Sequence, residues 1–173
     1  MTLVLRLPDP QLQREFSAMV DEFRAAGEKH LVDDGVLVEQ GFHAYVDWLS
    51  RRARGDFDGV PPRQAWWAVD SDTNQVLGVS SLQHPLTPWM AEFAGHIGYR
   101  VRPSVRRRGL GSRLLALTLK RAQAAGVAPA VIVCHPDNQG SIGVARNNGA
   151  AFEREVVTYG MELHRYLAPT DGH

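Results

Sequence analysis

The sequence has a single cysteine, no excess of either charge and no long apolar run, and each of these absences excludes a class of protein. Cys134 alone cannot form an intramolecular disulfide or a multi-cysteine zinc cluster, which favours a reducing compartment. The 19 Lys and Arg residues balance 19 Asp and Glu residues, so the chain lacks the overall positive field that attracts nucleic acids and anionic membranes. No segment approaches the roughly 18 consecutive apolar residues that span a bilayer. We therefore expect a soluble cytoplasmic protein that binds neither nucleic acid nor membrane.

The remaining composition is that of an ordinary globular domain. The chain has 173 residues, 44% of them hydrophobic and 22% charged, which is enough to bury one core. No internal repeat or low-complexity tract divides the sequence. We expect a single domain over residues 1–173.

Hydrophobic periodicity predicts an alternation of strands and helices, which indicates a mixed α/β fold with a central sheet flanked by about four helices. The helix between the strands at 96–101 and 130–134 forms a βαβ unit, which is expected to cross over right-handed. Residues 29–39 form a polar, irregular stretch. The expected strands are 2–7, 64–69, 76–82, 96–101 and 130–134, with one or two more within 151–167, and the expected helices are 10–26, 42–54, 110–126 and 138–148.

The junction between the strand at 96–101 and the following helix is the most informative segment. It reads Val-Arg-Pro-Ser-Val-Arg-Arg-Arg-Gly-Leu-Gly-Ser over residues 101–112. Free N–H groups and the positive end of the helix dipole make such a junction an anion site, and glycines let the backbone approach a phosphate. A Walker A loop is excluded because no Gly-Lys-Ser/Thr is present, and a dinucleotide fingerprint is excluded because Leu114 stands where a third glycine is needed. The alternative is a solvated arginine run before a glycine-containing helix start.

The remaining pattern, Arg-x-x-Gly-x-Gly at 106–111, resembles motif A of the GNAT superfamily of acyl-coenzyme A-dependent N-acetyltransferases. Residues 95–104 are similar to a branch of predicted bacterial acetyltransferases. Asp-Asn-Gln-Gly-Ser at 137–141, followed by Asn148-Gly149, resembles the family's second motif, and Arg165-Tyr166 resembles the branch's C-terminal strand. The resemblance extends from about residue 60 to residue 166. It implies a GNAT-like fold with a splayed strand pair, and acetyl-CoA as the cosubstrate.

The resemblance also implies where acetyl-CoA would bind. The strand backbone at Tyr99 and Val101 would pair with the pantetheine arm, the loop would hold the pyrophosphate, and Asn138 and Ser141 would line the far side of the slot. The alternatives are that Asn138 only caps a helix and that Tyr99 is a core aromatic residue. The implied cofactor-binding residues are Tyr99, Val101, Arg106, Arg107, Arg108, Gly109, Leu110, Gly111, Ser112, Asn138 and Ser141.

The sequence departs from the family at the residue that protonates the leaving thiolate. Many members carry a tyrosine where this chain has Ala145. Tyr99, Tyr159, Tyr166 or a water would then do that work, or the thiolate leaves unaided, since a thiol is acidic enough to leave as an anion.

The acceptor amine must also lose a proton before it attacks. Glu92 ranks first as the general base, His84 second and His96 third, because all three surround the entry to the cofactor strand. An exposed Glu92 is otherwise an ordinary solvated charge, and His96 is otherwise a hydrogen-bonded structural residue.

These patterns predict an acetyltransferase that acylates a primary amine of a small molecule or a protein by direct attack, without an acyl-enzyme. The rival interpretation, favoured by Ala145, is a non-catalytic acyl-CoA-binding or regulatory module. The histidines lack helical metal-ligand spacing, so we expect no metal. A homodimer is allowed for, since the superfamily often dimerises.

Overall fold

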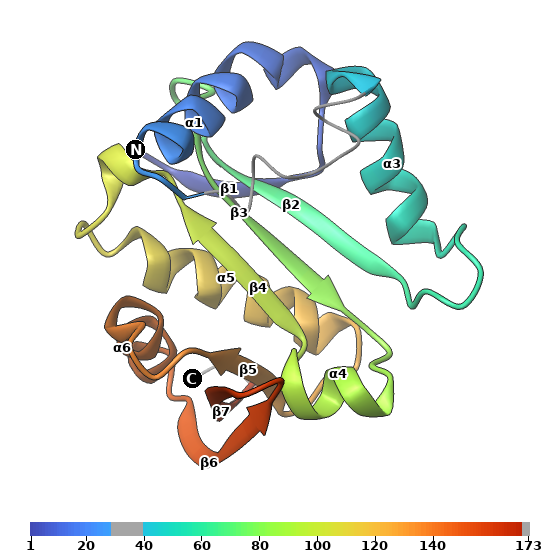
Figure 1. Ribbon diagram of the computed structural model, residues 1–173. Helices are drawn as coiled ribbons and strands as arrows, with labels where there is room; N and C mark the ends of the chain where they lie inside the picture. The colour runs from blue at the N-terminus through green and yellow to red at the C-terminus, as the bar shows by residue number, and fades with distance from the viewer. Residues whose placement is uncertain (29–39, 171–173) are drawn as a thin grey trace.

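The computed structural model describes residues 1–28 and 40–170, which form two antiparallel sheets with helices packed around them (Figure 1). One sheet has the order β1-β2-β3-β4 and the other the order β5-β7-β6. The strands are β1 (Leu3–Arg6), β2 (Arg63–Asp70), β3 (Val76–Gln83), β4 (Ile97–Val101), β5 (Ala130–Cys134), β6 (Ala151–Thr158) and β7 (Met161–Ala168). The helices are α1 (Gln13–Ala25), α3 (Phe42–Arg54), α4 (Pro88–Phe93), α5 (Leu110–Ala124) and α6 (Gln139–Asn147), with short 3-10 turns η1 (Pro10–Leu12) and η3 (Pro103–Val105).

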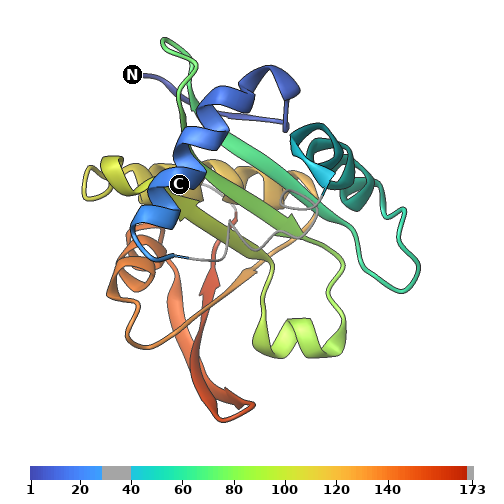
Figure 2. The same ribbon diagram turned by 45° about the horizontal axis from the view of Figure 1, so that its top comes forward.

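The four-stranded sheet is buried on both faces, and two adjacent tryptophans on β2 show why. Successive side chains of a strand point to opposite faces. Trp67 packs with Phe16 of α1 and Phe42 of α3, whereas Trp66 belongs to the core that includes Leu115 of α5. Helices α1 and α3 therefore cover one face and α5 the other, an arrangement that Figure 2 shows from a second side.

Strands β4 and β5 lie side by side but pair only at one end. Gly95 bridges Ile132, the His96 N–H donates to the Val131 carbonyl at 2.8 Å, and the Val131 N–H donates to His96 Nδ1 at 3.0 Å. Along its other edge β5 pairs with β7 over its whole length, so β4 and β5 belong to different sheets. The splayed strand pair implied by the resemblance is confirmed.

The structure confirms the expected mixed fold and the predicted order of elements. Two differences concern detail. No helix was expected between the strands at 76–82 and 96–101, where the chain contains Pro85 and Pro88, and the structure has the short helix α4 there. Thr87 caps α4 by accepting a hydrogen bond from the Met90 N–H. The predicted irregular stretch at 29–39 lies outside the described residues. No helix in the described ranges is long and apolar enough to cross a membrane.

Gly78 provides a test of the sheet that carries the site. A Cβ added at Gly78 would lie 2.4 Å from the Arg100 carbonyl oxygen on β4, so Gly78→Ala must push β3 and β4 apart. We expect a loss of about 2 kcal/mol or more in the free energy of unfolding, measured by urea denaturation.

Gly143→Ala in α6 is the matched control. Its Cβ would meet no atom within 4 Å, and alanine is the better helix former, so this variant should be more stable by about 0.5–1 kcal/mol. Equal effects of the two substitutions would contradict the close β3–β4 contact.

Candidate active site

The free edge of β4 is the first component of the site. His96 and Arg102 both hydrogen-bond to β3, through the Gln83 N–H and the Leu77 carbonyl. Because backbone groups alternate in direction along an antiparallel ladder, those of Ile97, Tyr99 and Val101 point away from β3 toward the splay. The backbone of Tyr99 therefore faces the opening between the two sheets, as an amide-bearing ligand would require.

The loop after β4 is held by two acidic side chains, Glu22 on α1 and Glu28 just after it. Glu22 accepts from Arg102 Nε at 2.7 Å and from the Ser104 N–H at 3.0 Å. Glu28 accepts from both terminal nitrogens of Arg106, at 2.6 and 2.9 Å, while Arg106 Nε donates to the Val101 carbonyl. Arg106 thus anchors the loop, and its charge is already paired, which differs from a free phosphate ligand.

The loop then turns into α5 through two residues with left-handed backbone. Arg107 has φ +63° and Gly109, the residue before the helix, has φ +73°. The first N–H groups of a helix have no partner within it, so this turn presents donors and the positive helix dipole to an anion. A Cβ at Gly109 would meet open space, so a side chain there would intrude on whatever the loop binds.

Gly111 lines the larger pocket described below and is also a packing residue. A Cβ at Gly111 would lie 2.8 Å from Val144 Cγ2, so this glycine lets α5 approach α6 closely. The Asn148 amide ties the same two helices together by donating to the Ser112 and Val144 carbonyls. Asn148 of the second motif is therefore part of the packing between the helices.

Helix α6 begins at the opposite wall of the opening. Asn138 Oδ1 accepts from the Ser141 N–H at 3.0 Å, so Asn138 is a helix cap. It also lines both pockets described below, as does Ser141. The two interpretations of Asn138 are thus compatible.

A pocket of about 920 Å³ lies between the β4 edge, the start of α5 and α6. Its lining contains ten of the eleven residues implied for the cofactor. Arg108 is the exception, because it is exposed and outside the lining. Seven further lining residues were not expected from the sequence. Five belong to α6, next to the motif residues Asn138 and Ser141, so the motif could have indicated them: Gln139, Gly140, Gly143, Val144 and Asn147. No sequence pattern indicates the other two, Glu28 and Arg100.

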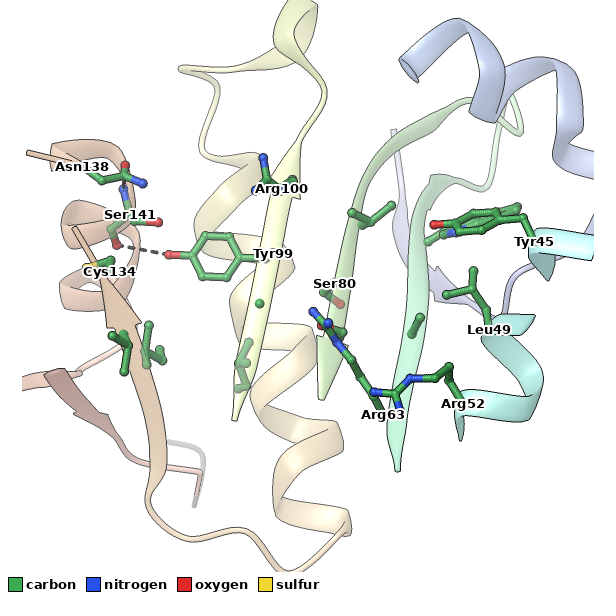
Figure 3. A pocket seen from close by; sticks show the side chains of 18 of the residues that line it. Tyr45, Leu49, Arg52, Arg63, Ser80, Tyr99, Arg100, Cys134, Asn138 and Ser141 are labelled. Atoms are coloured by element: carbon green, nitrogen blue, oxygen red, sulfur yellow. Dashed lines mark hydrogen bonds between the residues drawn. The ribbon is translucent and has the colours of Figure 1, made fainter. Parts of the chain in front are cut away.

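A second pocket, of about 490 Å³, opens on the other side of the splay (Figure 3). Its floor is the face of β2, β3 and β4 that turns toward α3, and Tyr45, Leu49 and Arg52 of α3 form one wall. Three arginines line it, and the described lining includes no Asp, Glu or His. Tyr99, Arg100, Asn138 and Ser141 line both pockets and mark the junction between them.

Tyr99 is the tyrosine at this junction. Its hydroxyl donates to the Ser141 carbonyl at 3.1 Å (Figure 3), and burial raises its pKa to about 12, so it stays protonated at neutral pH. Tyr166 is buried in the core and Tyr159 is 87% exposed on the turn between β6 and β7, and neither lines a pocket. Ala145 is completely buried.

The structure gives the three base candidates other partners and leaves them out of the lining of both pockets. Glu92 forms a two-bond ion pair with Arg154 that docks α4 on β6, and this hydrogen bond holds the pKa of Glu92 below its ordinary value. His96 accepts a bond from β5, and burial lowers its pKa, while His84 is exposed beside it. The assignment of the general base to one of these three residues stays a prediction.

Two further groups bear on the chemistry. Cys134 lines the smaller pocket, and burial raises the pKa of its thiol, which disfavours a nucleophilic thiolate. Glu155, Glu162 and His164 of the β6–β7 hairpin bring ligand atoms within 4.8 Å of one another, a grouping that helical spacing does not reveal. The two glutamates are exposed and the group lies outside both pockets, so it contributes nothing to this site.

Comparison with known proteins agrees with this geometry. The acetyltransferase (GNAT) domain family matches residues 18–151, well over half of the chain. No curated protein sequence matches significantly. Among solved structures, the ribosomal L7/L12 α-N-protein acetyltransferase RimL with coenzyme A is similar at TM-score 0.70 and 20% identity, covering 100% of this chain and 97% of that one.

Two further solved structures share the fold. A ribosomal-protein-S5-alanine acetyltransferase from Vibrio fischeri has TM-score 0.72 and 14% identity, covering 99% of this chain and 94% of that one. The microcin C7 self-immunity acetyltransferase MccE, in complex with acetyl-CoA and AMP, has TM-score 0.69 and 14% identity, covering 96% and 92%. At these identities the likeness concerns the fold.

The support of the loop by Glu22 predicts a pH-dependent stability. Burial tends to raise the pKa of Glu22, but hydrogen bonds from Ser104 and Arg102 outweigh it and hold the pKa below its ordinary value. A carboxylate of this kind stabilises the fold fully above its unfolded pKa of about 4.3, and that stability is lost as the pH falls through the lower folded pKa. Glu22→Gln should therefore cost about 2 kcal/mol at pH 7 and progressively less below pH 4, measured by urea unfolding.

Asp21→Asn on the same helix is the control. Asp21 pairs with Arg24 at the surface, with side chains 70% and 58% exposed, so its loss should change the free energy of unfolding by no more than about 0.5 kcal/mol. A Glu22→Gln penalty that stays constant down to pH 3 would show that packing, not charge, holds the loop.

Proposed function

The chain belongs to the GNAT family of acetyltransferases, and we propose that it transfers an acetyl group from acetyl-CoA to a primary amine by direct attack. The observation that carries this proposal is the junction of two pockets at Tyr99. One pocket combines an unpaired strand edge with a helix N-terminus, and the other opens to the opposite side of the same strand.

The residues of the larger pocket fit acetyl-CoA. The pantetheine arm carries amides that pair with a strand edge, and the outward backbone of Tyr99 and Val101 supplies the complementary groups. The pyrophosphate suits the N–H groups at the start of α5, next to Gly109 and Arg107. The acetyl thioester would then reach the junction with the smaller pocket. When bound, acetyl-CoA supplies an activated acyl carbon.

The acetyl group passes directly from the thioester to the amine, with no acyl-enzyme intermediate. The amine nitrogen attacks the thioester carbonyl, the carbon–sulfur bond breaks, and the products are an amide and the CoA thiolate. Tyr99 lies at the junction, and its hydroxyl would stabilise that sulfur by turning its single O–H there from the Ser141 carbonyl. Full proton transfer from a phenol of pKa about 12 to a thiolate with a pKa of about 8.5 is uphill, so Tyr99 stabilises the thiolate and water supplies the proton.

The acceptor amine would enter in its neutral form. The smaller pocket is open to solvent, and its described lining offers no carboxylate or imidazole as a base. Water therefore takes one proton from the ammonium form before attack, and it takes a second proton from the attacking nitrogen as the amide forms. The names of RimL and the S5-alanine acetyltransferase describe acylation of ribosomal proteins, and a protein amino group stays an acceptor class for this chain beside small amines.

Binding of acetyl-CoA is the first test, because a ligand that binds only the folded state stabilises it. Acetyl-CoA at about one hundred times its dissociation constant should stabilise the protein by roughly 2.7 kcal/mol, and a panel of primary amines should release free CoA thiol. Gly109→Ala should weaken acetyl-CoA binding by about tenfold or more, because its Cβ enters the space at the loop. Binding without CoA release across the panel would favour the non-catalytic module.

Gly59→Ala is the matched control for backbone strain. Gly59 also has a positive φ, +70° against +73°, and a Cβ there also meets open space, but it lies outside both pockets. It should bind acetyl-CoA as the wild type does. Equal losses in both variants would mean that strain explains the effect.

Tyr99→Phe tests the stabilisation of the thiolate. Removal of one donor to a developing charge typically costs about 10²- to 10³-fold in turnover, and here the loss should be toward the lower end because a thiolate leaves readily. Steady-state kinetics should show a fall in kcat with little change in the KM for acetyl-CoA.

Two controls accompany this measurement. Tyr159→Phe removes an exposed hydroxyl far from both pockets and should leave kcat unchanged. Glu92→Gln breaks only the pair with Arg154 and should keep turnover within about threefold of wild type. A loss of 100-fold or more in Glu92→Gln would restore Glu92 as the general base.

A further inference from the structure

The charge of the smaller pocket is one-sided. Arg52 of α3, Arg63 of β2 and Arg100 of β4 line it, from three elements far apart in the sequence, and the described lining holds no acidic residue. Figure 3 shows these arginines around the space that Tyr45 and Tyr99 border from either side. An aqueous pocket with three cations attracts anions.

Two of these arginines have no salt bridge or hydrogen bond from their guanidinium groups among the described residues. Arg52 lies only near the Phe57 ring, at 5.9 Å. Arg100 is half-buried, and burial lowers its pKa more than the attraction of Glu28 raises it, because Glu28 is hydrogen-bonded to Arg106. A partly buried cation without a counter-ion costs free energy that a ligand anion would recover.

Arg63 is held in place on the pocket floor. Its Nε and Nη2 both donate to Ser81 Oγ, at 3.1 and 2.9 Å. Gly98 lies opposite Ser81, and a Cβ there would be 3.5 Å from Arg63 Nη2, so the glycine leaves the floor open beside the guanidinium. Gly98 thus leaves the Arg63 guanidinium accessible from the pocket.

Two of these cations are separate from the phosphate loop. Arg52 and Arg63 line only the smaller pocket, Arg106 and Arg107 line only the larger one, and Arg100 lies at the junction of the two. The CoA phosphates are accounted for by the loop, so the positive charge on the acceptor side calls for another anion.

We propose that the acceptor is an anionic amine, whose carboxylate or phosphate group is bound by Arg52, Arg63 and Arg100 while its amine faces the junction at Tyr99. This inference rests on the proposed acetyl transfer and specifies its substrate class. Guanidinium groups suit both anions because their planar donors match two oxygens at once. The stacked rings of Tyr45 and Trp48, 6.2 Å apart, give the pocket an aromatic wall for the remainder of the acceptor. Polyamines and other polycations are disfavoured by like-charge repulsion.

The experiment compares matched acceptors at saturating acetyl-CoA, with CoA thiol release as the readout. Amino acids are paired with their amides, and O-phosphoethanolamine with ethanolamine. The anionic member of at least one pair should have a kcat/KM about tenfold or more above its neutral partner, and the pair that responds distinguishes carboxylate from phosphate. Neutral members that react equally well or better in every pair overturn the proposal.

Arginine variants locate the effect. Arg52→Gln should raise the KM for the anionic acceptor about tenfold and leave that for its neutral partner unchanged. Arg100→Gln, at the junction of both pockets, should raise the KM for the anionic acceptor more than that for its neutral partner. Arg51→Gln is the matched control, because Arg51 is the next residue on α3 and lies near the same Phe57 ring but outside the pocket. An Arg51→Gln effect as large as that of Arg52→Gln would refute the assignment.

A binding measurement separates failure of this inference from failure of the acetyl transfer. The affinity for acetyl-CoA should be unchanged in Arg52→Gln. If the wild type does not bind acetyl-CoA at all, the proposed function itself is overturned. Trp48 and Trp67 line the pocket and report acceptor binding by fluorescence in the presence of CoA, even if no pair is turned over. Tighter binding of the anionic members supports the proposal, and no preference overturns it.

Discussion

The site depends on the point at which β4 and β5 diverge. Gly95 has φ +76°, and a Cβ there would lie 2.6 Å from the Val131 carbonyl oxygen, so only glycine lets the strands meet so closely. His96 then holds the contact with two hydrogen bonds to Val131. Strand β5 is paired along its other edge with β7, and beyond this contact the edge of β4 is left without a strand. Unpaired backbone groups inside a protein need partners, so the splay is by itself a receptor for an amide-bearing ligand.

The loop between β4 and α5 is rich in arginine, but it offers an anion mainly backbone N–H groups. Arg106 is tied to Glu28 and to the Val101 carbonyl, and Arg102 to Glu22, so two of the loop's cations support its shape. The donors left for a ligand are chiefly N–H groups at the start of α5. The acidic residues that hold the loop, Glu22 and Glu28, lie within the family match but before the motifs that can be seen in the sequence. The shape of the loop therefore depends on residues outside the motif.

Much of the fold and the cofactor wall could be predicted from the sequence because both depend on local patterns. Periodicity located the strand at 130–134 and the helix that begins at Leu110, and the spacing of Gly109 and Gly111 located the loop. The acceptor side could not be found this way. Arg52, Arg63 and Arg100 meet only through the register of β2, β3 and β4 and the docking of α3. The base ranking failed to anticipate Arg154, 62 residues after Glu92, which holds that carboxylate on β6.

The charge of the smaller pocket also bears on the missing base. Neighbouring cations disfavour a bound ammonium and lower the pKa of an acceptor amine, which shifts it toward the neutral form that attacks. A cationic pocket therefore favours the neutral amine, as a general base would. It also repels the ammonium form of the acceptor, so another group of the acceptor must be attracted to the pocket. An anion on the acceptor meets this condition, because it compensates the arginines at one end while the amine stays near Tyr99 at the other. One arrangement of charge would then account both for the absence of a carboxylate in the described lining and for the selection of the acceptor.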